Sequence, residues 1–399
     1  MDLNWLLDPI TDSEFFRTNW EVQPLFIDRG APDYFATLPG LDSVEELITA
    51  TSSGKIRSRE DANLVRSEPI GTPSAREIQL NVKGIPDIQD VYRAYREGYT
   101  VIVNRIHYRS AVVADLSRAL EASLHHPVGV NLYLTPQHGQ GLPPHVDTHD
   151  VFILQLHGVK EWHVGSPPQE LPLANAEKEK IELCEFRKFR LNPGDMLYLP
   201  RGFPHEALTS TSSSLHLTVG VHAYRWIDLM SEALGALAEE DLQLRRTLPP
   251  GFLDRPLDVA HVSGLVEGLA GCLKRGPLAE RAKVRLGTKL FQDAKAVGSG
   301  NFRSLDAIAS LTEDSLIARV PDLFCQVRSN SGESVIEFPG NFVSGPLFLE
   351  SALRFIANHD HFVVRDLPDT LSREDKLDLV GRLVAEGLLQ ILPESKEDV

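Results

Sequence analysis

A histidine and an aspartate two positions apart, His145 and Asp147, place the tightest constraint on what this chain folds into. The apolar, β-branched run from Val151 to Leu156 follows them directly and predicts a strand. Side chains two positions apart in a strand point to one face, so an extended pair would share one space. One imidazole and one carboxylate there are two thirds of a site in which two histidines and a carboxylate hold a metal.

A second segment supplies the third ligand, His205. Gly194 and Asp195 predict a turn, Met196 to Leu199 a short strand, and the following Pro-Arg-Gly-Phe-Pro run a turn that leads into His205. A lone His-x-Asp pair is more often a hydrogen-bonded surface or core pair, but the second segment reverses that balance. The layout is typical of a double-stranded β-helix (cupin) barrel. Its triad holds Fe(II) and leaves positions open for a co-substrate and O2.

Length and composition restrict the kind of protein that could carry such a site. The 399 residues are enough for two or three domains, and 42% hydrophobic with 24% charged residues is ordinary for a soluble protein. No apolar run is long enough to span a bilayer, and the N-terminus lacks a secretory pattern. Three scattered cysteines, Cys184, Cys272 and Cys325, fit a reducing cytoplasm and are expected to be small core residues.

The charge balance restricts the partners. Forty Lys and Arg against 56 Asp and Glu give a net charge of −16, which argues against broad nucleic-acid binding. The same charge would suit a basic protein or peptide, although it would also serve solubility alone.

Periodicity predicts an α+β chain of three parts. Residues 1–226 hold N-terminal helices and the barrel, whose core covers about 98–224; residues 227–310 are helical, and 311–399 form a smaller unit. Within the first part, alternation over 78–82 predicts an edge strand, and the serine-rich run at 209–214 predicts a turn between strands.

The order helix, strand, helix, strand near the C-terminus predicts a winged-helix-like fold. Ser372 is expected to cap the second of these helices, with Glu374 and Asp375 in its first turn. Residues 311–399 contain 8 Lys and Arg against 16 Asp and Glu, so DNA phosphates would meet a repulsive surface. The unit is therefore expected to be a protein-interaction or structural module.

Taken together, these motifs resemble the JmjC-type ribosomal oxygenases, which are Fe(II)- and 2-oxoglutarate-dependent protein hydroxylases. The resemblance covers most of the chain. It is carried by the Leu-Asp-Pro-Ile-Thr opening, by Asn-Leu-Tyr-Leu-Thr-Pro at 131–136, by 145–162, and by 194–205. The helical stretch and the acidic end resemble the family's dimerisation region and C-terminal domain. The resemblance therefore implies a homodimer. With the cysteines, the apolar runs and the charge described above, we expect a cytoplasmic protein that acts on a basic protein or peptide and binds neither a membrane nor nucleic acid.

The resemblance also implies roles for individual residues. His145, Asp147 and His205 would bind Fe(II), and Lys160, on the strand after the His-x-Asp segment, would pair with the distal carboxylate of 2-oxoglutarate. An ordinary exposed strand lysine is the alternative for Lys160. The pocket for co-substrate and substrate would be lined by Asn131, Tyr133 and, on a later strand, Thr218.

One position departs from the family pattern. Gly220 stands where the family has a small hydroxyl residue, so a hydrogen bond to the co-substrate would be missing or supplied by Thr218. His149 could be an alternative ligand, but a structural or substrate-side role is favoured. Other activities stay open: hydroxylation of a biosynthetic peptide or small molecule, lysine demethylation, and a non-catalytic cupin scaffold.

Overall fold

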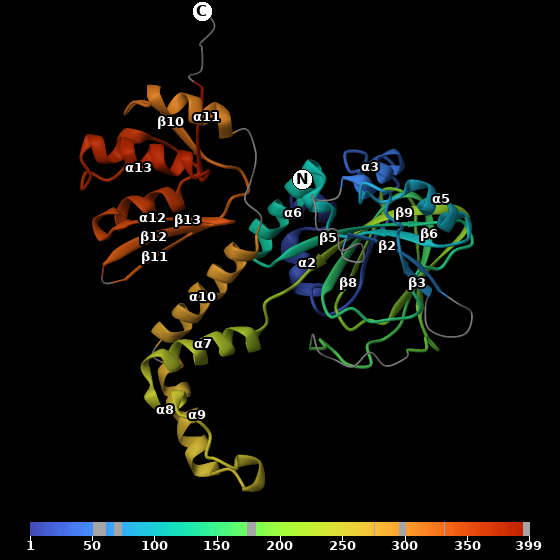
Figure 1. The fold of residues 1–399 in the computed structure, drawn as a ribbon, viewed down its shortest axis with the longest axis horizontal. Helices are drawn as coiled ribbons and strands as arrows, with labels where there is room; N and C mark the ends of the chain where they lie inside the picture. Colours follow the sequence, from blue (N-terminus) through green and yellow to red (C-terminus); the bar gives the residue numbers. More distant parts are fainter. Residues whose placement is uncertain are drawn as a thin grey trace, which may run out of the picture. The chain divides into compact units, whose positions relative to one another are not determined.

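The computed structural model describes residues 1–50, 61–67, 74–173, 181–274, 276–294, 301–330 and 332–393. The chain divides into two compact units, Met1–Ala223 and Tyr224–Val399 (Figure 1). Each unit has a separate hydrophobic core. In the described part of the chain, no helix is long and apolar enough to cross a membrane.

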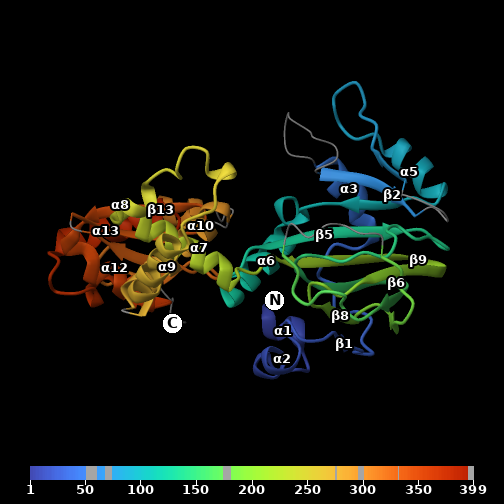
Figure 2. The ribbon, with the colours of Figure 1, turned by 90° about the horizontal axis from the view of Figure 1, so that it is seen from below.

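One antiparallel sheet forms the body of the first unit. Its strands follow the order β1-β8-β6-β9-β5-β4-β2-β3, and β7 pairs with β6. The two long strands β6 and β9 lie side by side with β5 next to them (Figure 2). The bounds are β1 Leu25–Ile27, β2 Ala62–Arg66, β3 Ser74–Glu77, β4 Thr100–Val103, β5 Val128–Thr135, β6 Asp150–Val164, β7 Arg187–Leu191, β8 Met196–Leu199 and β9 His205–Val221.

Short helices pack against this sheet and begin at capping residues that the sequence marks. The Thr11, Asp87 and Ser110 side chains each accept a hydrogen bond from a backbone N–H in the first turn of a helix. The helices and 3-10 turns are α1 Leu3–Leu7, α2 Asp12–Thr18, η1 Leu41–Ser43, α3 Val44–Thr49, α5 Ile88–Arg96, η2 Ile106–Tyr108 and α6 Ala111–Leu124. Leu116 and Leu120 of α6 are fully buried and join the core of the sheet. The spacing of Val113, Leu116, Leu120 and Leu124 in the sequence predicts an amphipathic helix over 110–124, and α6 confirms it.

The serine-rich run at 209–214 is not a turn, so that prediction was wrong. The run lies inside β9, which continues unbroken from His205 to Val221. Its partner β6 shifts register twice, and Gly158 in the second shift has φ of +65°. A Cβ atom on Gly158 would lie 1.8 Å from the Ser213 carbonyl oxygen. Glycine therefore lets the polar run approach β6 and remain in the sheet.

Two segments that were predicted to be strands are not strands in the structure. His145 and Asp147 precede β6 in an irregular segment, where only His145 forms an isolated bridge, to His205. The alternating run 78–82 follows the end of β3 and contributes one isolated bridge, from Leu80 to Pro86. In both segments Pro and Gly neighbours interrupt the ladder that alternation alone suggested. Lys160 lies in β6, the strand that directly follows the His-x-Asp segment.

The second unit begins with helices and ends in two small sheets. A cluster of buried side chains, including Ala233, Ala236, Leu278 and Ala282, packs α7 against α10. The helices are α7 Trp226–Glu240, α8 Leu242–Arg245, η3 Phe252–Asp254, α9 Val259–Lys274, α10 Pro277–Asp293 and α11 Asn301–Ala307. The Gly-Ser-Gly-Asn run at 298–301 predicts a break between helices, but 298–300 lie outside the described residues.

The C-terminal part contains more strands than the sequence predicted. One sheet has the order β14-β10-β15, and a meander β11-β12-β13 was missed because its strands are short and carry polar residues. Ser372 caps α13 with Asp375 in a capping box, as predicted. The bounds are η4 Ile308–Ser310, β10 Leu316–Arg319, β11 Gln326–Ser329, β12 Glu333–Phe338, β13 Asn341–Pro346, η5 Leu347–Leu349, α12 Glu350–Asn358, β14 His361–Val363, η6 Val364–Asp366, α13 Arg373–Ala385 and β15 Leu389–Ile391.

The expectation that the cysteines are small core residues holds in part. Cys272 and Cys325 are half-buried and pack against hydrophobic cores of the second unit, whereas Cys184 is exposed, so the expectation was wrong for Cys184. Within the described residues none of the three forms a disulfide.

Candidate metal centre and co-substrate pocket

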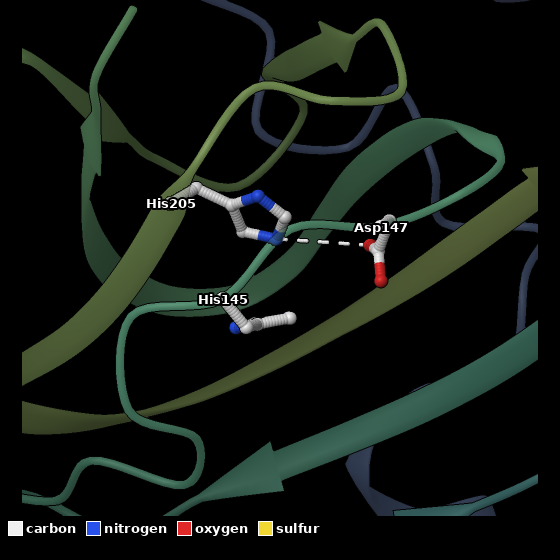
Figure 3. A group of neighbouring side chains, drawn as sticks. All are labelled: His145, Asp147 and His205. Carbon is white, nitrogen blue, oxygen red and sulfur yellow. Dashed lines mark ion pairs between the residues drawn. The ribbon is translucent and has the colours of Figure 1, made fainter. Parts of the chain in front are cut away.

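Three side chains that could bind a metal meet where the β6 and β9 segments begin. Ligand atoms of His145, Asp147 and His205 all lie within 4.8 Å of one another (Figure 3). His205 Nε2 is 3.7 Å from Asp147 Oδ2. The backbone N–H groups of His145 and His205 each donate to the other residue's carbonyl, at 3.1 and 2.9 Å. This reciprocal pair holds the two ligand segments together independently of the side chains.

Backbone carbonyls fix the tautomer of both histidines. Nδ1 of His145 lies 2.9 Å from the Pro143 carbonyl, and Nδ1 of His205 lies 3.0 Å from the Phe203 carbonyl. A carbonyl only accepts, so each Nδ1 carries the proton and each Nε2 keeps its lone pair. Burial, followed by repulsion from His145, lowers the pKa of His205 to about 4. The donor set therefore fits a divalent metal at neutral pH, since metal binding requires deprotonated ligands.

A buried ion pair joins the chain segments that carry the ligands. Asp150, three residues after Asp147, is fully buried, and its carboxylate accepts from Arg201 Nη1 at 2.8 Å. The Tyr198 hydroxyl also donates to Asp150, at 2.9 Å. Gly202, next to Arg201, donates its N–H to the Asp147 carbonyl at 3.0 Å. These bonds connect the Asp147 segment to the turn that precedes His205.

Lys160 is a buried cation without a counter-charge. The side chain is 4% exposed, and its Nζ donates to the Thr135 hydroxyl at 3.0 Å. No carboxylate among the described residues pairs with it, and burial alone lowers its pKa to about 7. An ammonium group held in this way is ready to receive an anion, because a buried charge is stable only when paired. The alternative of an exposed strand lysine is excluded by this burial.

One cavity of about 670 Å³ is lined by the seven residues to which the resemblance gives a role, and also by His149 and Gly220. Asn131 pairs with Thr218 across β5 and β9, and its Oδ1 accepts from the Arg105 N–H at 2.8 Å. Burial, followed by repulsion from Asp147, raises the pKa of Tyr133 to about 12, so its phenol is neutral. The cavity thus places the possible metal ligands and the unpaired Lys160 in one space.

Sequence reasoning missed one buried member of the cavity wall, His216. Its ring stacks on Tyr133 at 5.0 Å between centroids, and its Nδ1 has no hydrogen-bond partner in the described part of the chain. Burial, followed by repulsion from Lys160, lowers its pKa well below the usual value. Its position two residues before Thr218 on one strand was the available signal. His149 also lines the cavity but lies outside the group of possible ligands.

Comparison with known proteins gives this site a family. A family model described as a JmjC domain matches residues 102–229. The chain is 34% identical over 286 residues to ribosomal oxygenase 2 of Rattus norvegicus, covering 67% of this chain and 59% of that protein. It is 30% identical over 262 residues to an Aedes aegypti protein named bifunctional lysine-specific demethylase and histidyl-hydroxylase NO66, covering 61% of this chain and 39% of that protein. The chain thus spans about three fifths or less of these relatives.

Solved structures show the same fold along nearly the whole chain. The crystal structure of Escherichia coli ribosomal oxygenase YcfD superposes with a TM-score of 0.57 at 20% identity, covering 96% of this chain and 98% of that one. YcfD in complex with cobalt and 2-oxoglutarate gives 0.56 at 19% identity, covering 96% and 99%. The mixed helix-and-sheet fold is therefore of the JmjC, or cupin, type. Together with the matched JmjC domain, these likenesses show that the chain belongs to the JmjC-domain ribosomal oxygenase family.

Proposed function

We propose that the protein is an Fe(II)- and 2-oxoglutarate-dependent oxygenase that hydroxylates a side chain of a protein or peptide. The observation that carries the proposal is the cavity that holds both the His145, Asp147 and His205 group and the unpaired cation Lys160. When bound, Fe(II) and 2-oxoglutarate supply the oxidation: O2 is reduced, one oxygen atom enters a substrate C–H bond, and the co-substrate leaves as succinate and CO2. The relative named for its complex with cobalt and 2-oxoglutarate supports this pair of cofactors.

Different side chains of the cavity would bind the metal and the co-substrate. His145 and His205 would offer their Nε2 lone pairs to Fe(II), and Asp147 one carboxylate oxygen. Lys160 Nζ would pair with the distal carboxylate of 2-oxoglutarate, and the Thr135 hydroxyl would orient the ammonium group. The buried aromatic wall would exclude water and so strengthen these contacts.

We propose that the substrate is a basic protein. The relatives named ribosomal oxygenase support a ribosomal protein, and a net charge of −16 would attract its basic segments. Such a substrate is present in the cytoplasm, where we place the reaction. The relative named as a demethylase makes lysine demethylation the second candidate.

The proposal is tested with Fe(II)-loaded protein, 2-oxoglutarate and peptides that tile the ribosomal proteins. We expect succinate in step with a peptide heavier by one oxygen atom, and neither product without O2. Formaldehyde from methyl-lysine peptides would show demethylation. Bound metal and co-substrate with no succinate from any peptide would contradict an oxygenase acting on ribosomal proteins and favour a scaffold or another substrate.

We propose further that the fold completes a double-stranded β-helix barrel, followed by a helical dimerisation region at 227–310 and a winged-helix-like module at 311–399. The antiparallel order around β6, β9 and β5 supports the barrel. Helix, strand, helix and strand in α12, β14, α13 and β15 support the module. Its surplus of acidic residues favours a protein partner over DNA.

Helix α9 supports the dimer. None of its sixteen residues is buried, and several exposed residues are apolar. Val259 and Val266 expose 73% and 60% of their surface, and Leu253 just before the helix exposes 84%. An apolar surface of this kind marks an interaction site, and a twofold dimer would cover the same face on two copies. We therefore expect a dimer held by α9.

The dimer is tested by light scattering of the eluted protein. Replacing Val262 and Val266 with glutamate should give a monomer, since each charge would be desolvated in the interface. Gln243→Glu adds the same charge at an exposed polar position and should leave the dimer intact. A wild-type monomer at micromolar concentration, or a dimer that survives both valine substitutions, would refute this arrangement.

A further inference from the structure

A closed ring of hydrogen bonds lies behind the possible metal centre and includes one residue of the N-terminal segment. Arg201 Nη1 donates to the Asp150 carboxylate at 2.8 Å, and Arg201 Nη2 is 2.5 Å from the Glu21 carboxylate. The Tyr198 hydroxyl donates to Asp150 at 2.9 Å and accepts from the Glu21 backbone N–H at 3.0 Å. Each of the four residues therefore contacts two others of this ring.

The ring joins separate segments of the first unit. Its members are Glu21 between α2 and β1, Asp150 at the first position of β6, Tyr198 in β8, and Arg201 in the turn between β8 and β9. Asp150 and Tyr198 are fully buried and Arg201 is 6% exposed, so only Glu21 reaches the surface. Hydrogen bonds between charged groups are strong in such surroundings, and a missing partner is costly. The ring therefore fixes the turn at Arg201 relative to the start of β6.

The backbone of Glu21 adopts a conformation that an L-residue rarely takes. Its φ is +59°, in the left-handed region that favours glycine. Trp20 stacks on the Tyr198 ring at 5.9 Å and 16°, and Phe15 of α2 meets the same ring edge-on at 4.9 Å. A residue other than glycine stays in this region only when its surroundings fix it, and such positions cluster at functional sites. The neighbouring aromatic rings thus help to hold Glu21 where its carboxylate meets Arg201.

Two backbone contacts connect the ring to the possible metal ligands. Gly202, next to Arg201, donates its N–H to the Asp147 carbonyl at 3.0 Å. Phe203, one residue further on, supplies the carbonyl that lies 3.0 Å from His205 Nδ1. A movement of Arg201 would therefore shift both the Asp147 backbone and the His205 ring. None of the four ring residues lines the cavity, so the ring acts on the site through these bonds and not by contact with a bound molecule.

A buried ion pair of this kind is a poor source of stability. Desolvation offsets most of the attraction between buried charges, and apolar residues of similar volume often give equal stability. Residues that hold metal ligands from behind have a different effect, since their removal commonly weakens metal binding by roughly 10–100-fold. The position of the ring behind two ligand segments favours this second role.

We propose that Glu21 is a positioning residue of the metal centre, which acts through Arg201 and Asp150 to hold the turn that leads into His205. The segment before β1 then belongs to the metal centre, although it supplies no ligand and is distant in the sequence from all three. The inference rests on the proposed function, because it needs a metal at this site. It goes beyond that function by giving a role to a residue that touches neither metal, co-substrate nor substrate.

The test measures Mn(II) affinity by calorimetry, and the electron paramagnetic resonance spectrum of bound Mn(II), on the full-length protein without O2. Glu21→Gln keeps the shape of the side chain but removes the charge that pairs with Arg201, and the position is exposed enough for the variant to fold. We expect Mn(II) affinity to fall about fivefold or more and the spectrum to change, because the ligands shift. A purely structural role would leave the spectrum unchanged.

The matched control removes the same charge from the same part of the chain. Glu14 is an exposed glutamate of α2, and Glu14→Gln should keep the wild-type affinity and spectrum. Thermal unfolding of each variant without metal measures the structural contribution separately.

A double-mutant cycle assigns the effect to the ring. Arg201→Met removes the side chain through which Glu21 is proposed to act, and Asp150→Asn in the same protein avoids an unpaired buried charge. Adding Glu21→Gln to this background should change Mn(II) affinity less than about twofold, because residues of one network are not additive.

The outcomes separate this inference from the proposed function. Wild-type affinity in Glu21→Gln, an unchanged spectrum, or a loss of affinity that persists at full size in the Arg201 and Asp150 background would overturn the positioning role. A wild-type protein that binds Mn(II) but forms no succinate would contradict the oxygenase and leave the positioning role standing. Succinate formation by the wild type, with equal Mn(II) affinity in Glu21→Gln, would do the reverse.

Discussion

Replacing Asp147 with alanine should abolish 2-oxoglutarate turnover and weaken metal binding by more than about 100-fold. Losing an outer-shell partner of a metal ligand already costs roughly 10–100-fold, and Asp147 is the only carboxylate of the proposed ligand group. Two neutral imidazoles would remain, and they neutralise none of the charge of the metal. The measurements are Mn(II) affinity by calorimetry and succinate formation under saturating 2-oxoglutarate.

The control for this variant removes a carboxylate that lies outside the cavity. Asp115 on α6 has a side chain that is 60% exposed, and Asp115→Ala should retain metal affinity and turnover. Circular dichroism of both variants would show whether the fold is kept. If the Asp147 variant still binds Mn(II) like the wild type, the ligand assignment is wrong.

Replacing Lys160 with methionine should weaken 2-oxoglutarate binding by roughly 100-fold or more while leaving the metal affinity unchanged. Removing one partner of a buried ion pair costs about 3–5 kcal/mol, because the other charge stays buried and unpaired. The unliganded variant should be at least as stable as the wild type, since burial already disfavours the charged amine. Calorimetric titration with 2-oxoglutarate and thermal unfolding check the two statements.

The same lysine predicts a pH dependence. In the free protein burial lowers the pKa of Lys160 to about 7, and the carboxylate of 2-oxoglutarate needs the protonated form. Below pH 7 the amine is already charged, so this residue should add no pH dependence there. Above pH 7 binding must take up a proton, and affinity should fall about tenfold per pH unit.

Two variants isolate this effect. Lys160→Met should abolish the slope above pH 7, because no amine remains to titrate. Lys188→Met removes an amine that is 60% exposed and should keep both the affinity and the slope. A wild-type affinity that stays constant from pH 7 to 9 would show that Lys160 does not bind the co-substrate as an ammonium ion.

Local signals predicted the start of α13 correctly, at Ser372, whose side chain caps the first turn. Asp87 and Ser110 cap α5 and α6 in the same way. Capping and apolar spacing involve residues only a few positions apart, so the sequence contains all of the information. The β11-β12-β13 meander escaped prediction because a short strand depends on its neighbours for stability.

Strand continuity around the site depended on contacts between distant residues. Ser213 lies in β9 because Gly158, in β6, leaves space for its carbonyl oxygen. No residue near Ser213 in the sequence indicates that Gly158 will be its neighbour, and a serine-rich run is typical of a turn. His145 likewise approaches His205 through a backbone bridge, and the Asp147 carbonyl accepts from the Gly202 N–H, so no shared strand face brings the ligands together.

The sequence by itself determined which side chains are available: a His-x-Asp pair, a later histidine, Lys160 and a glycine at position 220. Only the tertiary structure decided that Lys160 is buried with no counter-charge among the described residues and that Gly220 makes room for His149. The physical reason is that chemical identity belongs to single residues, whereas burial, pairing and free space depend on strand register. Register is set by partners tens of residues away, and the folded sheet brings them together.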